Sequence, residues 1–182
     1  CALPISIRDS ALAVSGRLNP TMYGPSVFPT IPRAVLEGQS MPGNGWGKSE
    51  PQEAARRSVY VFVKRAVRPP ELELLDFPDT TASCEQRVVS TIAPQALTLL
   101  NGDFMREQSA QFADRLVREC GVEAEDKQVQ RAFRLALCRP ATGAEAARTR
   151  AFLDAQRRQI QADRQGKGIG AEELRRRALA DF

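Results

Sequence analysis

Apolar residues recur at helical spacing through the second half of the chain. Between residues 103 and 119 they share one stripe, which Met105, Phe112 and Leu116 define, and Gly121 follows as a stop signal. The same helical spacing of apolar residues recurs over 126–138 and over 144–162. The pattern predicts a helical body over 91–182, built from helices over 91–100, 103–119, 126–138, 144–162 and from 171 onwards.

Capping residues mark the beginnings of several of these helices. Thr91 is a candidate cap for the helix over 91–100, and Thr142 with Glu145 forms a capping box before the helix over 144–162. Ser49 and Gln52 form a similar pair, so a further helix is expected to begin there. The last helix has no stop signal, and we expect it to continue past residue 182.

The first half of the chain has weaker periodicity. Residues 7–18 fit a short amphipathic helix, and residues 71–75 fit one or two helical turns. Residues 19–48 are rich in proline and glycine, which predicts a long irregular arm, and their apolar members favour an arm ordered against the helical body. The β-branched and aromatic run over 58–64 favours a buried strand, with a continued helix as the alternative.

Together these elements predict a mainly α fold. It consists of a helical body with a long irregular arm and at most a small β element. The first residues, Cys1-Ala2-Leu3-Pro4-Ile5, resemble a translated sequencing adapter, so residues 1–6 are set aside as a non-native segment. Residues 7–182 are then interpreted as a single partial domain that is cut at both ends.

Composition excludes several chemistries. The chain has no histidine, which excludes a Ser-His-Asp or Cys-His catalytic centre, a histidine-containing zinc site and a Cys-x-x-Cys-His haem attachment motif. Its 26 basic and 22 acidic residues are interleaved, so the net charge of +4 does not predict nucleic-acid binding. No apolar run reaches the length of a membrane span.

The four cysteines are too widely spaced in sequence to predict a metal site. We expect free or buried thiols. Cys120 and Cys138 lie at the two ends of a predicted helix, too far apart for a disulfide. Cys84 is expected at the same end of the helical body as Cys138, so a Cys84–Cys138 disulfide is the alternative.

Short motifs spread over residues 7–160 resemble those of one known family. They are Arg8-Asp9-Ser10-Ala11-Leu12, Gly24-Pro25-Ser26-Val27, Arg57-Ser58-Val59-Tyr60 with Lys64-Arg65, Asp76-Phe77-Pro78-Asp79, Cys84-x-x-Arg87, and Gln95-Ala96-Leu97-Thr98-Leu99-Leu100-Asn101. The chain thus resembles a planctomycete-specific domain of unknown function that lies C-terminal in large secreted proteins. Gln86 departs from the family pattern, which often has a second arginine before Arg87.

The resemblance implies a location and partners, and it implies no reaction. The location is extracytoplasmic or at the cell surface, and the partners are upstream domains of the same polypeptide. Proteins of this family often carry a cytochrome-c-like domain, so any haem is expected in an upstream domain and no cofactor in residues 1–182.

Basic residues around the 58–64 run form the first candidate site. They are Arg56, Arg57, Lys64, Arg65 and Arg68, and Tyr60 and Arg87 are further candidates for the same role. Guanidinium groups bind sulfate and carboxylate groups bidentately, so the cluster is a candidate pocket for an anionic glycan. The simpler interpretation is that these arginines form ion pairs with acidic residues near 73–79 and fasten the arm to the body.

Acidic and amide residues form the other candidates. Asp9, Asp76 and Asp79 are weak candidates for acid–base hydrolysis, which needs two carboxylates at a defined separation. The simpler interpretation makes Asp76 and Asp79 turn or cap residues. Gln95 and Asn101 flank an apolar helix and either contact a ligand or satisfy backbone groups of a neighbouring loop.

Two functions remain in view. The leading hypothesis is a non-catalytic accessory or structural module of a multi-domain cell-surface or secreted protein, which supports assembly or glycan capture. The alternative is a catalytic domain that hydrolyses polysaccharide through paired carboxylates.

Overall fold

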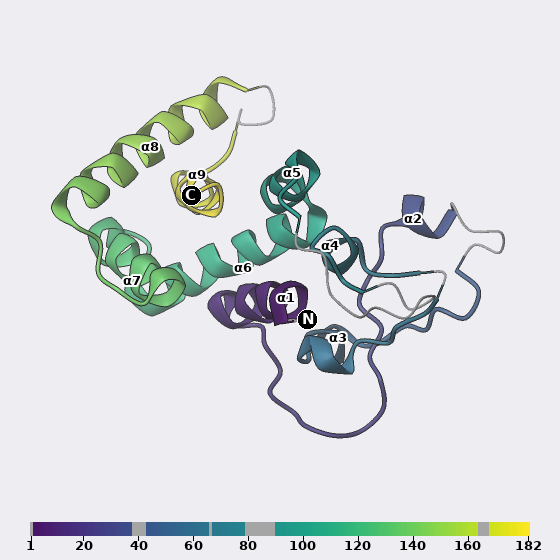
Figure 1. Cartoon of the computed structure of the whole chain (residues 1–182). Coiled ribbons are helices and arrows are strands. Elements are labelled where there is room, and N and C mark those ends of the chain that lie inside the picture. The colour runs from purple at the N-terminus through teal and green to yellow at the C-terminus, as the bar shows by residue number, and fades with distance from the viewer. Residues whose placement is uncertain (1, 38–42, 66, 79–89, 164–167) are drawn as a thin grey trace. The chain divides into compact units, whose positions relative to one another are not determined.

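The computed structural model describes residues 2–37, 43–65, 67–78, 90–163 and 168–182. It is mainly helical, with 62% of residues in helices and no strand among the described residues, which confirms the predicted fold class. Two compact units share the chain (Figure 1). Unit 1 comprises residues 1–13 and 17–105, and unit 2 comprises residues 14–16 and 106–182.

Unit 1 contains mostly short helices. They are α1 (Ala2–Ser15), whose end counts with unit 2, α2 (Arg33–Glu37), α3 (Pro51–Ala54), the single 3₁₀ turn η1 (Ser58–Tyr60), α4 (Pro70–Glu73) and α5 (Ala93–Asn101). Helix α1 includes residues 2–6, whose sequence resembles a translated adapter. Pro4 is fully buried, and Ile5 packs against a small core of Val27, Val61 and Leu72.

The predicted strand over 58–64 is wrong. Its first residues form η1, and the rest makes only isolated bridges, including one parallel bridge between Val61 and Val27 of the arm. Two hydrogen bonds surround this bridge, from Val27 N to Tyr60 O at 2.8 Å and from Phe62 N to Val27 O at 2.9 Å. Pro25 and Pro29 flank Val27 and lack the N–H donors that a longer ladder needs, so pairing stops at one residue.

The arm is ordered where the structure describes it, over 19–37 and 43–48. An aromatic cluster ties its two parts to residues after η1: the ring centroid of Phe28 lies 5.6 Å from that of Trp46 and 5.0 Å from that of Phe62. Ser49 does not cap α3, contrary to the sequence prediction, because its hydroxyl oxygen accepts a hydrogen bond from Phe28 N at 2.9 Å. Glu50 occupies the cap position without a side-chain bond.

Among its described residues, unit 2 contains four helices, as the sequence pattern predicted. They are α6 (Asp103–Cys120), whose first turn counts with unit 1, α7 (Glu125–Leu137), α8 (Gly143–Ala162) and α9 (Ala171–Ala180). Helix α8 packs against both α7 and α9 (Figure 1). Their shared core consists of buried alanine, valine and leucine side chains: Ala113, Leu116, Val129, Ala132, Leu153, Ala178 and Leu179.

Caps define the ends of these helices. The Thr142 hydroxyl accepts from Glu145 N, and the Glu145 carboxylate accepts from Thr142 N at 2.8 Å, which confirms the capping box. Gly121 ends α6 with a φ of +92°, where a side chain would be strained. None of the helices in the described ranges is both long and apolar enough to cross a bilayer.

Candidate functional site

A buried arginine holds the first turn of the arm. The side chain of Arg56 is 2% exposed, and its guanidinium donates hydrogen bonds to three main-chain carbonyls of one turn. Nε donates to Thr21 O and Nη1 to Pro25 O, each at 3.2 Å, and Nη2 donates to Tyr23 O. Because the planar guanidinium has its donors in a fixed fork, one side chain defines the shape of the whole turn.

The turn itself has an uncommon backbone conformation. Tyr23 has a φ of +65°, and Gly24 follows with a φ of +87°. A non-glycine residue in the left-handed region is strained unless neighbouring groups hold it there. The bonds to Arg56 do so, together with a bond of 2.9 Å from Tyr23 N to the hydroxyl oxygen of Tyr60. The turn therefore presents Met22 (56% exposed) and Tyr23 (79% exposed) in a fixed position.

A second buried arginine joins α1 to the segment between α3 and η1. Arg8 is 3% exposed, and its Nη2 donates to Ala54 O at 2.7 Å. Its Nη1 donates to Arg56 O and to the Ser58 hydroxyl, each at 3.1 Å. Arg8 thus binds the main chain of Arg56, and the side chain of Arg56 binds the arm. The two arginines together connect α1 to the arm.

Burial shifts the pKa values of two titratable groups around Arg8. Burial lowers the pKa of the Arg8 guanidinium, against the opposing effects of Glu71 and Asp9. Burial also raises the pKa of the Glu71 carboxyl, against its backbone hydrogen bond and the charge of Arg8. The Arg8 Nε lies 4.0 Å from Glu71, and the Arg8 Nη1 lies 3.9 Å from Asp9. These two carboxylates supply the negative charge that a buried guanidinium needs.

Asp9, a candidate acid–base residue, binds the start of η1. One of its carboxylate oxygens accepts hydrogen bonds from both the backbone N–H and the hydroxyl of Ser58, each at 2.7 Å. Ser58 is buried and also accepts from Arg8. Asp9 is therefore part of the same polar network as the two arginines.

Asp76, the second candidate carboxylate, binds the beginning of α5. It has a φ of +62° and accepts from the backbone N–H and the hydroxyl of Ser90, each at 2.7 Å. The hydrogen bond from the Ser90 N–H is the main reason why the pKa of Asp76 is lowered. Gln95 Nε2 donates to Ser90 Oγ at 3.1 Å and to Asp76 at 3.4 Å. Asp76 is thus placed to orient the N-terminus of a helix.

Gln95 also provides the cap of α5. Its Oε1 accepts from Ile92 N at 3.2 Å, and Ile92, not Thr91, is the cap residue of the helix. The prediction that Thr91 caps this helix is wrong, because the amide of Gln95 reaches back to the free N–H instead. The use of Gln95 to satisfy backbone groups is one of the two interpretations that the sequence left open.

The other candidates are dispersed. Arg57 and Arg65 are exposed and form no ion pair with any other described residue, while Lys64 donates to Asn44 O. The nearby acid Glu73 pairs instead with Arg68, at 3.2 Å. Asn101 is exposed in the last turn of α5. Three further residues lie outside the described ranges: Asp79, Cys84 and Arg87. The thiols of Cys120 and Cys138 are free.

Sequence reasoning missed the role of Arg8, and it named Arg56 only as one member of a basic cluster, without its bonds to the carbonyls of the arm. Arg8 lies within the amphipathic pattern of residues 7–18, where a charged residue on the helix suggests a solvated position. Arg56 and Arg57 are adjacent in sequence, and nothing in the sequence shows which of them is buried. The one available signal was the proline and glycine content of the arm, whose carbonyls need donors from elsewhere in the chain.

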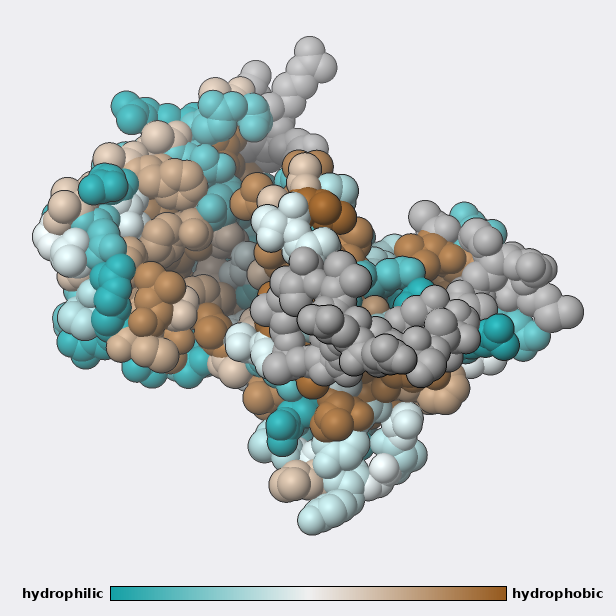
Figure 2. Space-filling model, viewed as in Figure 1, coloured by the Kyte–Doolittle hydropathy of each residue, from teal (hydrophilic) through white to brown (hydrophobic). Residues whose placement is uncertain are grey.

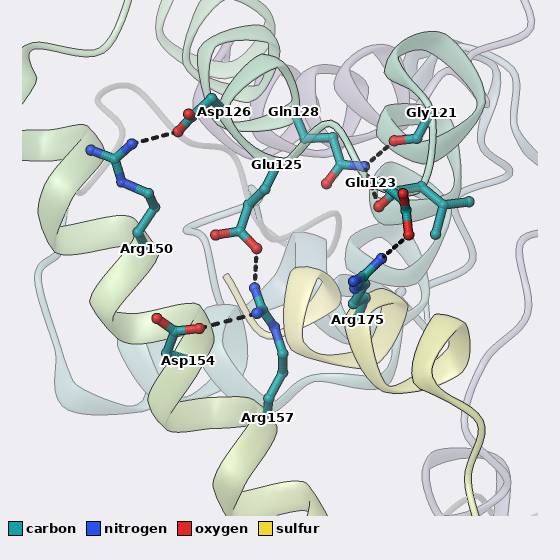
Figure 3. A network of polar contacts seen from close by, with 10 residues as sticks. Gly121, Glu123, Glu125, Asp126, Gln128, Arg150, Asp154, Arg157 and Arg175 are labelled. Atoms are coloured by element: carbon teal, nitrogen blue, oxygen red, sulfur yellow. Dashed lines mark hydrogen bonds and ion pairs between the residues drawn. The ribbon is translucent and has the colours of Figure 1, made fainter.

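Unit 2 contains a small polar cavity of about 90 Å³ between α7, α8 and α9. Figure 3 shows the charges that line it and the neighbouring ion pairs. Arg157 donates to Asp154 at 3.0 Å and to Glu125, and Arg175 donates to Glu123 at 3.2 Å. The acidic and basic side chains neutralise one another, and the volume holds only a few waters. No group of metal-ligating side chains gathers in the part of the chain that the structure describes.

A family model described as PSD1, a protein of unknown function (DUF1553), matches residues 4–153. The chain belongs to the PSD1 family. The match includes the networks of Arg8, Arg56 and Asp76 and ends within α8, and α9 follows it. No curated protein and no solved structure matches the PSD1 chain.

Proposed function

We propose that this PSD1 chain is a non-catalytic accessory module of a multi-domain planctomycete protein, secreted or held at the cell surface. The observation that carries the proposal is the use of the buried charges. Arg56 and Arg8 direct their guanidinium donors mainly at the chain's own carbonyls, and Asp9 and Asp76 accept from backbone N–H groups of the chain. These groups hold the arm and the N-terminal ends of η1 and α5, so their role is structural.

The module is proposed to work beside upstream domains of the same polypeptide. It supports their assembly, and haem chemistry belongs to an upstream cytochrome-c-like domain. The absence of histidine from the chain agrees with this division, because histidine is the commonest haem ligand. The proposed location is extracytoplasmic.

Capture of an anionic glycan is the second proposed role. It rests on Arg57 and Arg65, which are exposed and form no ion pair with another described residue. Exposed guanidinium groups that no described carboxylate binds remain able to bind sulfate or carboxylate groups. A sulfated ligand is expected to bind more weakly as salt increases, because its contacts are exposed and screened.

An array of sulfated, carboxylated and neutral oligosaccharides, probed with the whole chain, tests this role. The double variant Arg57→Ala/Arg65→Ala is expected to lose about tenfold or more in affinity for the anionic glycans. Arg134→Ala, which removes an exposed arginine from α7, is the matched control and should bind as the wild type does. Failure of every anionic glycan to bind removes the capture role and leaves the accessory role standing.

The accessory role has its own test. The wild-type chain is incubated with the same polysaccharides, and reducing ends are measured over time. No release is expected. Release that Asp9→Asn or Asp76→Asn abolishes, in variants with wild-type circular dichroism, would make the chain a hydrolase and contradict the proposal.

A further inference from the structure

Helix α5 has an apolar surface that nothing in the described structure covers. No residue of this helix is buried. Large side chains along it are exposed: Ile92 just before the helix by 48%, Leu97 by 58%, Leu99 by 37% and Leu100 by 74%. Hydrophobic residues gather over α5 in Figure 2. Such a group of leucines on one helix is typical of an interaction surface.

The sequence around α5 also lacks charge. Residues 88–102 contain no Asp, Glu, Lys or Arg, in a chain of which 26% of residues are charged. An isolated helix of this length is marginal in water, and most helices gain their stability from packing of an apolar face. Helix α5 therefore has the composition of a packed helix and the exposure of an unpacked one.

The N-terminal end of α5 is fixed although its apolar face is exposed. A network of hydrogen bonds holds its first turn and joins Asp76, Ser90 and Gln95. Thr98 O accepts from Gly102 N at 2.8 Å and closes the last turn. The leucines are thus presented on a helix whose two ends are defined, which lowers the entropy lost when a partner binds.

We propose that α5 is a self-association surface, on which α5 of a second copy of this chain packs in the antiparallel direction. The residues of one face show the required complementarity. At helical spacing Ala93, Ala96, Leu97 and Leu100 share a face, and all four are exposed. An antiparallel pair with its two-fold axis between residues 96 and 97 places Ala93 opposite Leu100 and Ala96 opposite Leu97.

Every large side chain on this face then meets a small one. Such an isologous contact lets the backbones approach closely and leaves no leucine facing a leucine across the axis. The lack of charge over 88–102 matters as well, because two identical copies of a charged segment would bring like charges together at the contact, and this segment has none. A single short helix buries less than the ~800 Å² per partner of a standard interface, so the dimer is weak, with a dissociation constant on the order of 100 µM.

Sedimentation velocity of the whole chain, from about 5 to about 500 µM, tests the proposal. The weight-average sedimentation coefficient is expected to rise with concentration from the monomer to the dimer value. Leu97→Glu should abolish the rise, because it places a carboxylate against an alanine near the axis. Leu137→Glu is the matched control, since Leu137 in α7 is 55% exposed, and it should leave the rise unchanged.

A second variant distinguishes specific antiparallel packing from non-specific hydrophobic association. Ala93→Leu adds apolar surface to α5 but places leucine opposite Leu100, so the antiparallel pair should weaken about tenfold. Circular dichroism at 222 nm checks that each variant is folded. A chain that stays monomeric to the highest concentration, an Ala93→Leu variant that associates more tightly, or a Leu137→Glu variant that dissociates like Leu97→Glu would each overturn the proposal. This inference is independent of glycan capture, and the glycan array does not decide it.

Discussion

The guanidinium carbon of Arg56 lies 4.0 Å from the centroid of the Tyr60 ring, and the hydroxyl of the same tyrosine accepts the backbone N–H of Tyr23. Through the cation–π contact and the hydrogen bond, Tyr60 contacts both the buried arginine and the turn that this arginine holds. The arginine, the tyrosine and the turn are therefore expected to lose stability together when any one of them is changed.

Arg56→Lys is expected to lower the free energy of unfolding by about 3 kcal/mol, because an ammonium group cannot bond three divergent carbonyls and leaves buried acceptors unpaired. Urea denaturation measures the change. Arg57→Ala provides the control at the neighbouring position and should change stability by less than about 0.5 kcal/mol, since Arg57 is exposed. Equal losses in the two variants would show that burial of Arg56 is not what stabilises the turn.

Tyr60→Phe removes the acceptor for Tyr23 N and keeps the ring that faces Arg56. A loss of about 1 kcal/mol is expected, as for a single hydrogen bond. Tyr60→Leu removes the ring face as well and should cost about 1 kcal/mol more. The two variants are compared by thermal and urea unfolding, and a Tyr60→Phe variant as stable as the wild type would show that the hydroxyl does not support the turn.

Cys138→Gly is expected to stabilise the chain by about 0.5–1 kcal/mol. Cys138 follows α7 with a φ of +56°, a left-handed conformation that glycine adopts without steric cost. Cys120→Gly serves as the contrasting substitution, because Cys120 lies in the last turn of α6 with helical geometry and glycine there is expected to destabilise. Differential scanning calorimetry of the two variants should give shifts of opposite sign.

Acid sensitivity is expected from Glu173 in α9. Hydrogen bonds from Arg176 and Arg177 lower the pKa of the Glu173 carboxyl from 4.5 to about 2. A carboxyl whose pKa is lower in the folded than in the unfolded state stabilises the fold above pH 4.5. This contribution decreases as the pH falls from 4.5 towards about 2.

Glu173→Gln should therefore flatten the fall of melting temperature across that pH range. The effect is modest, because the Glu173 side chain is 37% exposed and solvent screens its charge. Glu172→Gln, next to it in the first turn of α9, is the control, and it should retain the wild-type pH dependence. Identical pH profiles for Glu173→Gln and the wild type would contradict the assigned role of the two arginines.

The helices of unit 2 could be predicted from sequence because each carries its own signal. The apolar period, Gly121 as a stop and the Thr142–Glu145 box are local features, and local features decided where α6, α7 and α8 lie. Unit 1 was harder. Residues 58–64 have strand composition, but strand formation depends on a partner, and Pro25 and Pro29 prevent the arm from acting as one.

The candidate site depended even more on tertiary context. The sequence drew attention to Arg56, Arg57 and Arg65 alike, whereas burial selected Arg56, together with Arg8, for the internal bonds. Ser49 and Thr91 have the right chemistry for caps, yet Ser49 accepts from Phe28 and Gln95 replaces Thr91. In each instance a residue from a distant part of the chain, or a longer side chain nearby, offered a better bond than the local one.

Every bond from Arg56 to the arm ends on a main-chain oxygen, so no side chain of residues 21–25 is needed to make it. The loop can therefore change its outward-facing chemistry, at Met22 for example, while it keeps its shape. With such a support, the side chains that the turn exposes are independent of the main-chain bonds that fix its shape. Variation among related chains could then accumulate at the tip, with the anchor beneath it unchanged.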